Sequence, residues 1–340
     1  MRPLVHPALA RAWRDSSTVQ IGLDSAHAVV VAGLGPAEVA VLRSMDGVRD
    51  VTALRAVAER CGGSASAADR LVEILATAGV LLDGDRIRPD DPDDALAPDR
   101  ASRSLLGPGT RDAAVLPEFD DPLAARRQAQ VEVRGAGRVG AMVARLLAAA
   151  GVGRITADDG GQGTARDLAP GGLDRGAVGL RRGLAVSVML PDLPDRPYDR
   201  PDLVVLAPTS DTARNDAAAL IRFGIPHLVA RVIETTGVVG PLVLPGTTSC
   251  LRCHDLHRAD RDPAWPRVLA QADGQPHGTA ACDVTLAAQV AALAAQQVVA
   301  HLDGFVPATV DGTVETALPY GLPRRRNWRP HPACGCTWAA

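Results

Sequence analysis

Apolar residues along the stretch from Val131 to Leu147 change their spacing midway, and the rest of the chain is organised around this change. Val131 and Val133 alternate with polar residues, as in a β-strand. From Val139 onward apolar residues recur every three or four positions, as in an amphipathic helix. The segment between the two patterns reads GAGRVG and contributes Gly135, Gly137 and Gly140. The pattern therefore predicts a strand, a tight glycine turn and a helix.

The three glycines have the spacing of a nucleotide-binding turn, G-x-G-x-x-G. In such a turn the first glycine permits the tight bend, the second lets a phosphate approach the backbone, and the third lets the helix pack closely on the strand. The helix N-terminus then offers free N–H groups to an anion. A second predicted strand, residues 153–159, ends in Asp158 and Asp159, about 20 residues beyond the glycines, where such folds hydrogen-bond a ribose hydroxyl. We interpret the unit as nucleotide-binding; the alternative is a tight turn that binds nothing.

Further apolar runs continue the alternation of strands and helices. We predict strands at 184–188, 203–207 and 227–232, a helix from 211 to 223, and strands around a turn at 238–244. Strands that alternate with helices of this length are typical of a mostly parallel sheet. The Ala-rich stretch from Cys282 to Leu302 predicts a helix packed across that sheet. The expected fold class is α/β, with a Rossmann-like domain over residues 127–340.

Residues 1–85 have the pattern of a small separate α+β domain. We predict two hairpin strands, three helices and a closing strand, at residues 18–23, 28–32, 36–45, 50–61, 65–78 and 80–83. This order is typical of a winged helix. Because the domain is not basic, we interpret it as a peptide-binding one that takes a partner strand onto its exposed sheet edge. The alternatives are a structural or dimerising domain and, last, a DNA-binding one. Residues 86–126 are acidic and proline-rich and predict a linker.

The composition narrows the function classes. Hydrophobic residues make up 46% of the 340 residues, enough for full cores, and the net charge of −3 implies no general affinity for nucleic acid. No signal peptide or run of about 18 apolar residues stands out, so we expect a cytoplasmic protein with no membrane partner. All 36 basic residues are arginine, which excludes Schiff-base chemistry and a P-loop lysine.

Four of the six cysteines form two close pairs, one C-x-x-C and one C-x-C: Cys250 with Cys253, and Cys334 with Cys336. In a cytoplasmic chain such pairs favour a metal over disulfides, and together they predict a closed, structural zinc site with four cysteine ligands. This site would fix the C-terminal tail to the loop after the sheet. The alternatives are a redox pair at the C-x-x-C turn, or ligation by the nearby His254 and His257.

Cys282, at the start of the Ala-rich helix, is a candidate nucleophile because a helix N-terminus stabilises a thiolate. The neighbouring Asp283 disfavours the thiolate, so we favour a quiet, half-buried cysteine. Cys61, at the end of a predicted helix, has no better claim. The sequence leaves the catalytic residues unassigned.

The combination of a glycine turn, an Asp-ending strand and paired cysteines resembles the ThiF family, the adenylyltransferases related to ubiquitin-activating enzymes. The stretch GPLVLPGTTSCLRC at 240–253 is similar to that family's approach to its zinc knuckle. The resemblance covers residues 127–340 and implies an ATP·Mg²⁺ site that adenylates a C-terminal carboxylate. The N-terminal domain resembles the leader-peptide recognition element of peptide-modification clusters. The whole chain resembles the ThiF-like proteins that bind the leader of a ribosomal precursor peptide and pass it to a YcaO-type cyclodehydratase.

Compared with the family pattern, the charged residues of the nucleotide site are depleted. The segment DLAPG from Asp167 stands where the family has Asn-Leu-x-Arg-Gln, and it lacks the arginine. The family's lysine corresponds at best to Arg182. Its Mg²⁺-binding aspartate falls near Thr209, where Asp211 is the nearest substitute, and the following arginine matches Arg214. The resemblance therefore implies a nucleotide site made of three glycines and five charged residues: Gly135, Gly137, Gly140, Asp158, Asp159, Arg182, Asp211 and Arg214.

Three functions follow, in decreasing order of support from the sequence. The first is a partner protein that binds a leader peptide for a YcaO-type or other modifying enzyme, on a catalytically degenerate ThiF-like scaffold. Because each lost charge contact to a phosphate costs about 1.5–3 kcal/mol, three losses would remove several powers of ten in rate. The second is an active adenylyltransferase acting on a carrier-protein or peptide carboxylate. The third is an NAD(P)-dependent oxidoreductase, against which the cysteine pairs argue. Relatives in the family are commonly dimers, which allows a homodimer.

Overall fold

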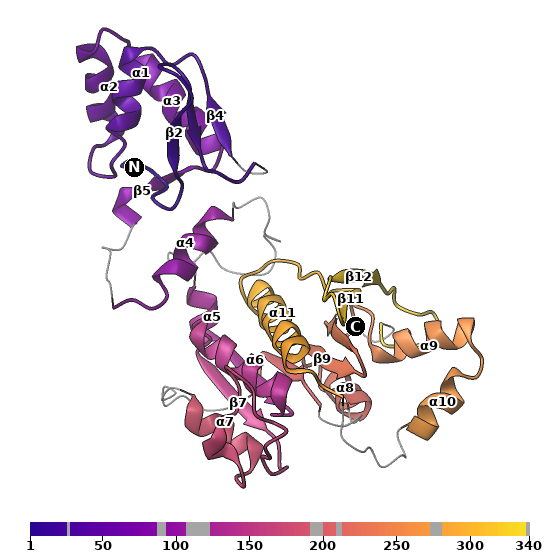
Figure 1. Cartoon of the computed structure of the whole chain (residues 1–340). Coiled ribbons are helices and arrows are strands. Elements are labelled where there is room, and N and C mark those ends of the chain that lie inside the picture. Colours follow the sequence, from indigo (N-terminus) through magenta and orange to yellow (C-terminus); the bar gives the residue numbers. More distant parts are fainter. Residues whose placement is uncertain are drawn as a thin grey trace. The chain divides into compact units, whose positions relative to one another are not determined.

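The computed structural model describes residues 1–25, 28–86, 93–106, 123–190, 200–208, 213–272 and 281–337. The chain divides into two compact units, Met1–Thr110 and Arg111–Ala340. The first combines helices with short strands, and the second is built around a seven-stranded sheet (Figure 1).

The N-terminal unit contains a three-stranded antiparallel sheet and a separate pair of strands. The sheet has the order β2 (Arg11–Trp13), β3 (Val19–Ile21), β4 (Val29–Val31), and β1 (Pro3–Val5) pairs with β5 (Leu81–Asp83). The hairpin of β3 and β4 and the closing strand β5 agree with the sequence prediction. The strands β1 and β2 have no counterpart in it, because three residues carry almost no alternation.

Three helices pack against this sheet: α1 (Pro36–Arg43), α2 (Val51–Arg60) and α3 (Ala65–Thr77). Asp50 and Ser64 cap α2 and α3, because each side chain accepts a hydrogen bond from the backbone N–H three residues further on. All three predicted helices are therefore present. The helices and strands bury a common core that includes Ile21, Val41, Leu54 and Leu75.

The predicted linker, residues 86–126, contains two helices in its described part: α4 (Ala97–Leu105) and α5 (Ala124–Gln128). In the N-terminal unit, the Ser104 hydroxyl of α4 lies 2.7 Å from Nε2 of His6. Residues 87–92 and 107–122 lie outside the described residues. The acidic, proline-rich composition of this segment therefore did not reveal its short helices, which depend on contacts with other parts of the chain.

The C-terminal unit is built on a sheet with the order β12-β11-β10-β9-β8-β6-β7. Four strands are parallel to one another: β6 (Gln130–Arg134), β7 (Arg154–Asp158), β8 (Leu203–Leu206) and β9 (His227–Ile233). Three antiparallel strands extend the sheet: β10 (Thr236–Val243), β11 (Gly312–Ala317) and β12 (Arg324–Asn327). The predicted Rossmann-like α/β fold class is confirmed, whereas β11 and β12 have no counterpart in the prediction.

Helices cover both faces of this sheet. On one face α6 (Arg138–Ala149) and α11 (Val284–Leu302) share a core with Val133 and Val205. On the other face α8 (Ala213–Arg222) packs with Val204, Leu206 and Leu251, the first residue of α9 (Leu251–Arg261). By length and hydropathy α11 passes as a membrane span. Its buried residues belong to the sheet core, which accounts for its apolar composition.

A buried ion pair joins three helices of the C-terminal unit. Arg126 of α5 donates from Nε and Nη2 to both carboxylate oxygens of Asp303, at 2.8 and 2.6 Å. Its Nη1 also donates to the carbonyl oxygen of Ala150, which follows α6. The two side chains are 6% and 2% exposed, so this pair fastens α5 to the ends of α6 and α11 from inside the protein.

The predicted strand at 184–188 is wrong, because these residues lie in α7 (Arg182–Met189). Ala185 and Val186 are adjacent and both buried, whereas Leu184 and Val188 are exposed, which is the pattern of a helix face. A short apolar run cannot be assigned to strand or helix by periodicity alone. The helix packs closely on the sheet, because a Cβ on Gly183 would lie 2.7 Å from the Ala157 carbonyl oxygen in β7.

The predicted pair of strands around a turn at 238–244 is also wrong. Residues 236–243 form the single strand β10, whose pairing with β9 shifts between Val239 and Leu242. Gly240 has φ +107° at this shift. A glycine and proline within a strand therefore mark a bulge and not a turn in this chain.

Candidate functional site

The glycine turn lies where the order of the parallel strands reverses. β7 lies on one side of β6 and β8 on the other, so the chain crosses from one side of β6 to the other between them. In open α/β sheets, ligands bind at the carboxyl ends of the strands beside such a reversal. Gly135 follows β6 directly, and α6 begins at Arg138. The turn thus lies where this class of sheet offers a ligand crevice.

Two of the three glycines are required by backbone packing alone. Gly135 has φ +92°, and a Cβ there would lie 2.1 Å from the carbonyl oxygen of Ala207. A Cβ on Gly140 would lie 1.8 Å from the carbonyl oxygen of Gly135. Gly137 is the N-cap of α6 with φ −73°, an ordinary angle for any residue. Gly135 and Gly140 serve the fold whether or not a phosphate binds, and the phosphate contact of Gly137 stays a prediction.

The Asp159 carboxylate is the centre of the hydrogen bonds beside this turn. Its Oδ2 accepts from the backbone N–H of Ala136 and its Oδ1 from that of Gly161, both at 2.8 Å. Arg182 donates from Nε to Oδ2 at 2.9 Å and from Nη2 to Oδ1 at 3.0 Å. A carboxylate has about four acceptor sites. All of them are therefore used within the protein.

Asp159 is charged in this environment. Burial would raise its pKa, but the hydrogen bonds from Arg182, Ala136 and Gly161 outweigh burial and lower the pKa below its usual value. Only 8% of the Asp159 side chain is exposed. The carboxylate thus links the glycine turn to the start of α7 as a buried ionic contact.

Arg182 is bonded to Asp159, one of the two carboxylates predicted for a ribose hydroxyl. Besides Asp159 it reaches the carbonyl oxygen of Gln162 at 3.2 Å, and its Nη1 lies 3.7 Å from Asp167 Oδ1. Asp158, by contrast, ends β7 with an exposed side chain. Asp158 is thus the exposed one of the two carboxylates, while Asp159 and Arg182 are bonded to each other, and a ribose contact from Asp158 stays a prediction.

Of the remaining two charged candidates, only Arg214 lies in the described residues, and it bonds to a residue outside this group. Arg214, near the start of α8, donates from Nε to Asp255 Oδ2 of α9 at 2.9 Å. Asp211 lies outside the described residues. The sequence interpretation passed over Arg138, whose Nη1 donates to the Cys282 carbonyl oxygen at 2.6 Å. Its position between two glycines of GAGRVG was the signal that could have found it.

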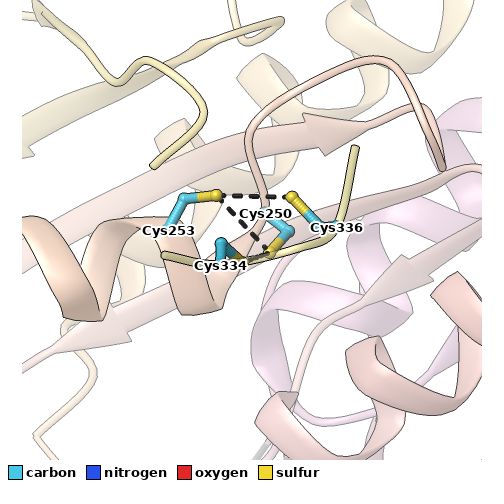
Figure 2. A group of neighbouring side chains, drawn as sticks. All are labelled: Cys250, Cys253, Cys334 and Cys336. Atoms are coloured by element: carbon cyan, nitrogen blue, oxygen red, sulfur yellow. Dashed lines mark hydrogen bonds between the residues drawn. The ribbon is translucent and has the colours of Figure 1, made fainter. Parts of the chain in front are cut away.

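The four paired cysteines converge on one point (Figure 2). The Sγ atom of Cys250 lies 3.9 Å from that of Cys253 and 3.5 Å from that of Cys334, and the Sγ atoms of Cys253 and Cys336 are 3.4 Å apart. All four sulfurs lie within 4.8 Å of one another, and all four residues are free thiols. Zinc–sulfur bonds of about 2.3 Å in a tetrahedron would place the sulfurs about 3.8 Å apart. The donor set fits a metal ion, and zinc in particular stays a prediction.

The pKa values of the thiols within this cluster are shifted in opposite directions. The hydrogen bond from the Cys250 thiol lowers the pKa of Cys253 to about 4, and the same bond, with burial, raises the pKa of Cys250. The backbone N–H of His331 also donates to the Cys253 sulfur at 3.3 Å. A bound cation would favour the thiolate form of all four, since it removes the repulsion that keeps the others protonated.

The two histidines considered as alternative ligands are engaged elsewhere. His254 is 2% exposed and stacks on Trp328, with ring centroids 4.4 Å apart. His257 Nε2 lies 2.9 Å from the carbonyl oxygen of Arg329. The cysteine quartet is complete without them. Cys282 is half-buried, and burial raises its pKa despite the nearby Arg138, which agrees with a quiet cysteine.

No family model matches the chain, and no curated protein matches it in sequence. Solved structures match its fold. E. coli MccB with succinimide has a TM-score of 0.75 at 15% identity over 100% of both chains. E. coli MccB with AMPCPP and MccA has a TM-score of 0.74 at 16% identity over 99% of each chain. PaaA has a TM-score of 0.67 at 17% identity over 94% of this chain and 98% of its own. The predicted ThiF-type fold is confirmed.

Proposed function

We propose that the protein binds a ribosomal precursor peptide as the partner of a peptide-modifying enzyme in natural-product biosynthesis. A peptide partner is supported by MccB, which shares the fold along the whole chain. MccB, a microcin C7 biosynthetic enzyme, has been solved in complex with N-formylated MccA. The modifying enzyme, of the YcaO type or another class, follows from the sequence resemblance. So does a homodimer.

The edge strand β4 is the place we propose for the leader peptide. In the described residues β4 pairs with β3 on one side only, and Val30 in its middle is 45% exposed. An extended peptide that adds to such an edge gains backbone hydrogen bonds, and alternate side chains give specificity. The opposite edge, β2, exposes Arg11 and Trp13, with Arg43 over the Trp13 ring. The uncharged, β-branched edge of β4 is the better acceptor for a strand.

The proposal that this protein delivers a peptide and does not adenylate it rests on Asp159, whose carboxylate already accepts four hydrogen bonds. A ribose hydroxyl can bond to Asp159 only after Arg182 or a backbone N–H has left. A phosphate that approaches Nε or Nη2 of Arg182 would have to displace Asp159, which would leave a charged carboxylate 8% exposed and partly unpaired. The two charged residues predicted for a nucleotide site thus form an ion pair that stabilises the fold.

Adenylation is the second candidate, and one observation favours it. The glycine turn, the α6 N-terminus and the exposed Asp158 lie together at the strand-order reversal, and Arg138 supplies a cation within the turn. MccB has also been solved with ATP. An active site here would use Asp158 for the ribose and Asp211 for Mg²⁺.

Zinc is the metal we propose for the cysteine cluster, since four thiolates in a tetrahedron are typical of structural zinc. Cys250 and Cys253 would hold it from the start of α9, and Cys334 and Cys336 from the C-terminal tail. With four protein ligands no position stays open for water, so the ion would supply stability and no chemistry.

A binding titration tests the proposal. Fluorescence anisotropy of the labelled precursor peptide encoded beside the gene should show binding by the zinc-loaded chain, and Val30→Asp should weaken it about tenfold or more. Val48→Asp is the matched control, because Val48 is 71% exposed in the same unit and lies outside the sheet. No binding of that peptide would contradict the proposed function. Equal loss of binding in both variants would contradict the assignment of the peptide to β4.

A further inference from the structure

We propose that the free edge of β12 binds an extended acidic segment of a partner protein as an added strand. This surface lies in the C-terminal unit and is independent of the leader site at β4. β12 is the last strand of the seven-stranded sheet, and within the described residues it pairs with β11 alone (Figure 1). All four of its residues, RRRN, are exposed. A long sheet thus ends in an uncovered strand.

The backbone of β12 offers a regular set of unused hydrogen-bonding groups. The N–H of Trp328 donates to the carbonyl oxygen of Asp311, at 2.9 Å, in register with the β11–β12 ladder. In an antiparallel ladder alternate residues bond to the same neighbour. Arg326 and Arg324 therefore direct their backbone groups to β11, whereas Arg325 and Asn327 direct theirs outward. This outward N–H and C=O pattern is what a further strand requires.

The side chains of β12 make this edge cationic. Arg324 and Arg326 lie on one face of the strand because side chains alternate. The opposing acid on that face is Glu315, whose carboxylate lies 3.3 Å from Arg326. Arg325, on the other face, donates to the carbonyl oxygens of Ala308 and Val310 in the loop before β11. One carboxylate against two exposed guanidinium groups leaves positive charge for a partner, in a chain whose net charge is −3.

This charge pattern selects the occupant. A second copy of β12 would place arginine opposite arginine, which is destabilising. A strand with an acidic residue at every second position would instead pair with Arg324 and Arg326. Just before β12, Tyr320 and Leu322 are 86% and 77% exposed, so an apolar residue at that end of the partner strand would find contacts. A nucleic acid would use the arginines but not the alternating N–H and C=O groups.

Fluorescence anisotropy with a designed probe tests this surface. The probe is a fluorescein-labelled peptide of alternating glutamate and valine with a leucine at one end, added to the full zinc-loaded chain. Binding should occur, and it should weaken roughly tenfold for Arg324→Glu, because attraction becomes repulsion. Asn327→Pro should weaken it roughly threefold to tenfold by removing one outward N–H, which leaves the β11 ladder intact. Arg267→Glu, an exposed arginine on the helix 265–272, is the charge-matched control and should change nothing.

Two further probes separate strand addition from simple charge attraction. The same peptide with alternate backbone amides N-methylated keeps its charge but cannot form a ladder, and it should not bind. Equal binding of the methylated peptide, or unchanged affinity in both Arg324→Glu and Asn327→Pro, would overturn the proposal. Tighter binding of a labelled oligouridylate than of the acidic peptide would overturn it in favour of a nucleic-acid surface.

Discussion

The cysteine cluster and the glycine turn are both visible in the sequence, yet the cysteines, unlike Asp159 and Arg182 beside the turn, keep their side chains available for a ligand in the folded chain. Four sulfurs from two distant segments converge within 4.8 Å, and they are arranged around a common centre. At the glycine turn, by contrast, Asp159 and Arg182 bond to each other. A motif therefore fixes where a site lies, whereas the partners of its charged groups decide whether a ligand can use them.

Loss of one metal ligand is the largest effect we expect. Cys334→Ser should abolish stoichiometric zinc and lower the Tm by about 10 °C or more, since structural zinc contributes about 10–16 kcal/mol in small peptides. Zinc content by mass spectrometry of metals and calorimetric melting measure both effects. Cys61→Ser, at an exposed cysteine of the N-terminal unit, is the control and should leave both unchanged. Full zinc content in Cys334→Ser would show that the cluster does not hold the metal.

Alanine at two glycines separates the glycine that packing requires from the one that packing leaves free. Gly140→Ala should cost about 3 kcal/mol or more of unfolding free energy, because its Cβ would lie 1.8 Å from the Gly135 carbonyl oxygen. Gly137→Ala should cost less than about 1 kcal/mol, because its φ is ordinary. Urea unfolding compares the two. A similar cost at both positions would mean that Gly137 also has a structural role.

Arg182→Ala tests whether the ionic contact serves the fold. We expect a loss of about 1–3 kcal/mol, because the change leaves the nearly buried Asp159 charge without its strongest partner. Arg181→Ala, at the exposed neighbour, should lie within about 0.5 kcal/mol of the wild type. An Arg182→Ala chain as stable as the wild type would show that the arginine is free for another use.

The pH dependence of that difference is the smallest effect. A carboxylate whose pKa is lower in the folded state contributes stability above its unfolded pKa of about 3.9, and loses it as pH falls through the folded pKa. The stability gap between wild type and Arg182→Ala should therefore be full at pH 7 and narrower at pH 3. Unfolding of both proteins across this range measures it. A gap that widens on acidification would contradict the lowered pKa of Asp159.

Local sequence signals predicted the parts of this fold that depend on local structure. The helices α2 and α3, the glycine turn and the Ala-rich helix α11 all carry their own pattern. The helix α7 does not, because a short apolar run is compatible with either structure and only its burial in the fold shows a helix face. β12 was missed for a different reason: four exposed polar residues have no alternation, and only pairing with β11 makes them a strand.

The candidate sites follow the same division. The spacing of the cysteines was enough to predict that four thiols would meet, since each pair is local and needs only to be brought together. The state of Asp159 was not predictable, because its partners Ala136 and Arg182 lie 23 residues away on either side. Only the fold shows that two residues assigned to one nucleotide are bonded to each other.

ATP–pyrophosphate exchange by the zinc-loaded chain, with a bound precursor peptide present, tests the central claim most directly. We predict no exchange above the protein-free rate, because Asp159 and Arg182 are committed to each other and the protein serves to bind the peptide. Peptide-dependent exchange that is lost in Arg182→Ala but kept in Arg181→Ala would contradict this claim, and would make the chain an adenylyltransferase whose arginine changes partners when ATP binds.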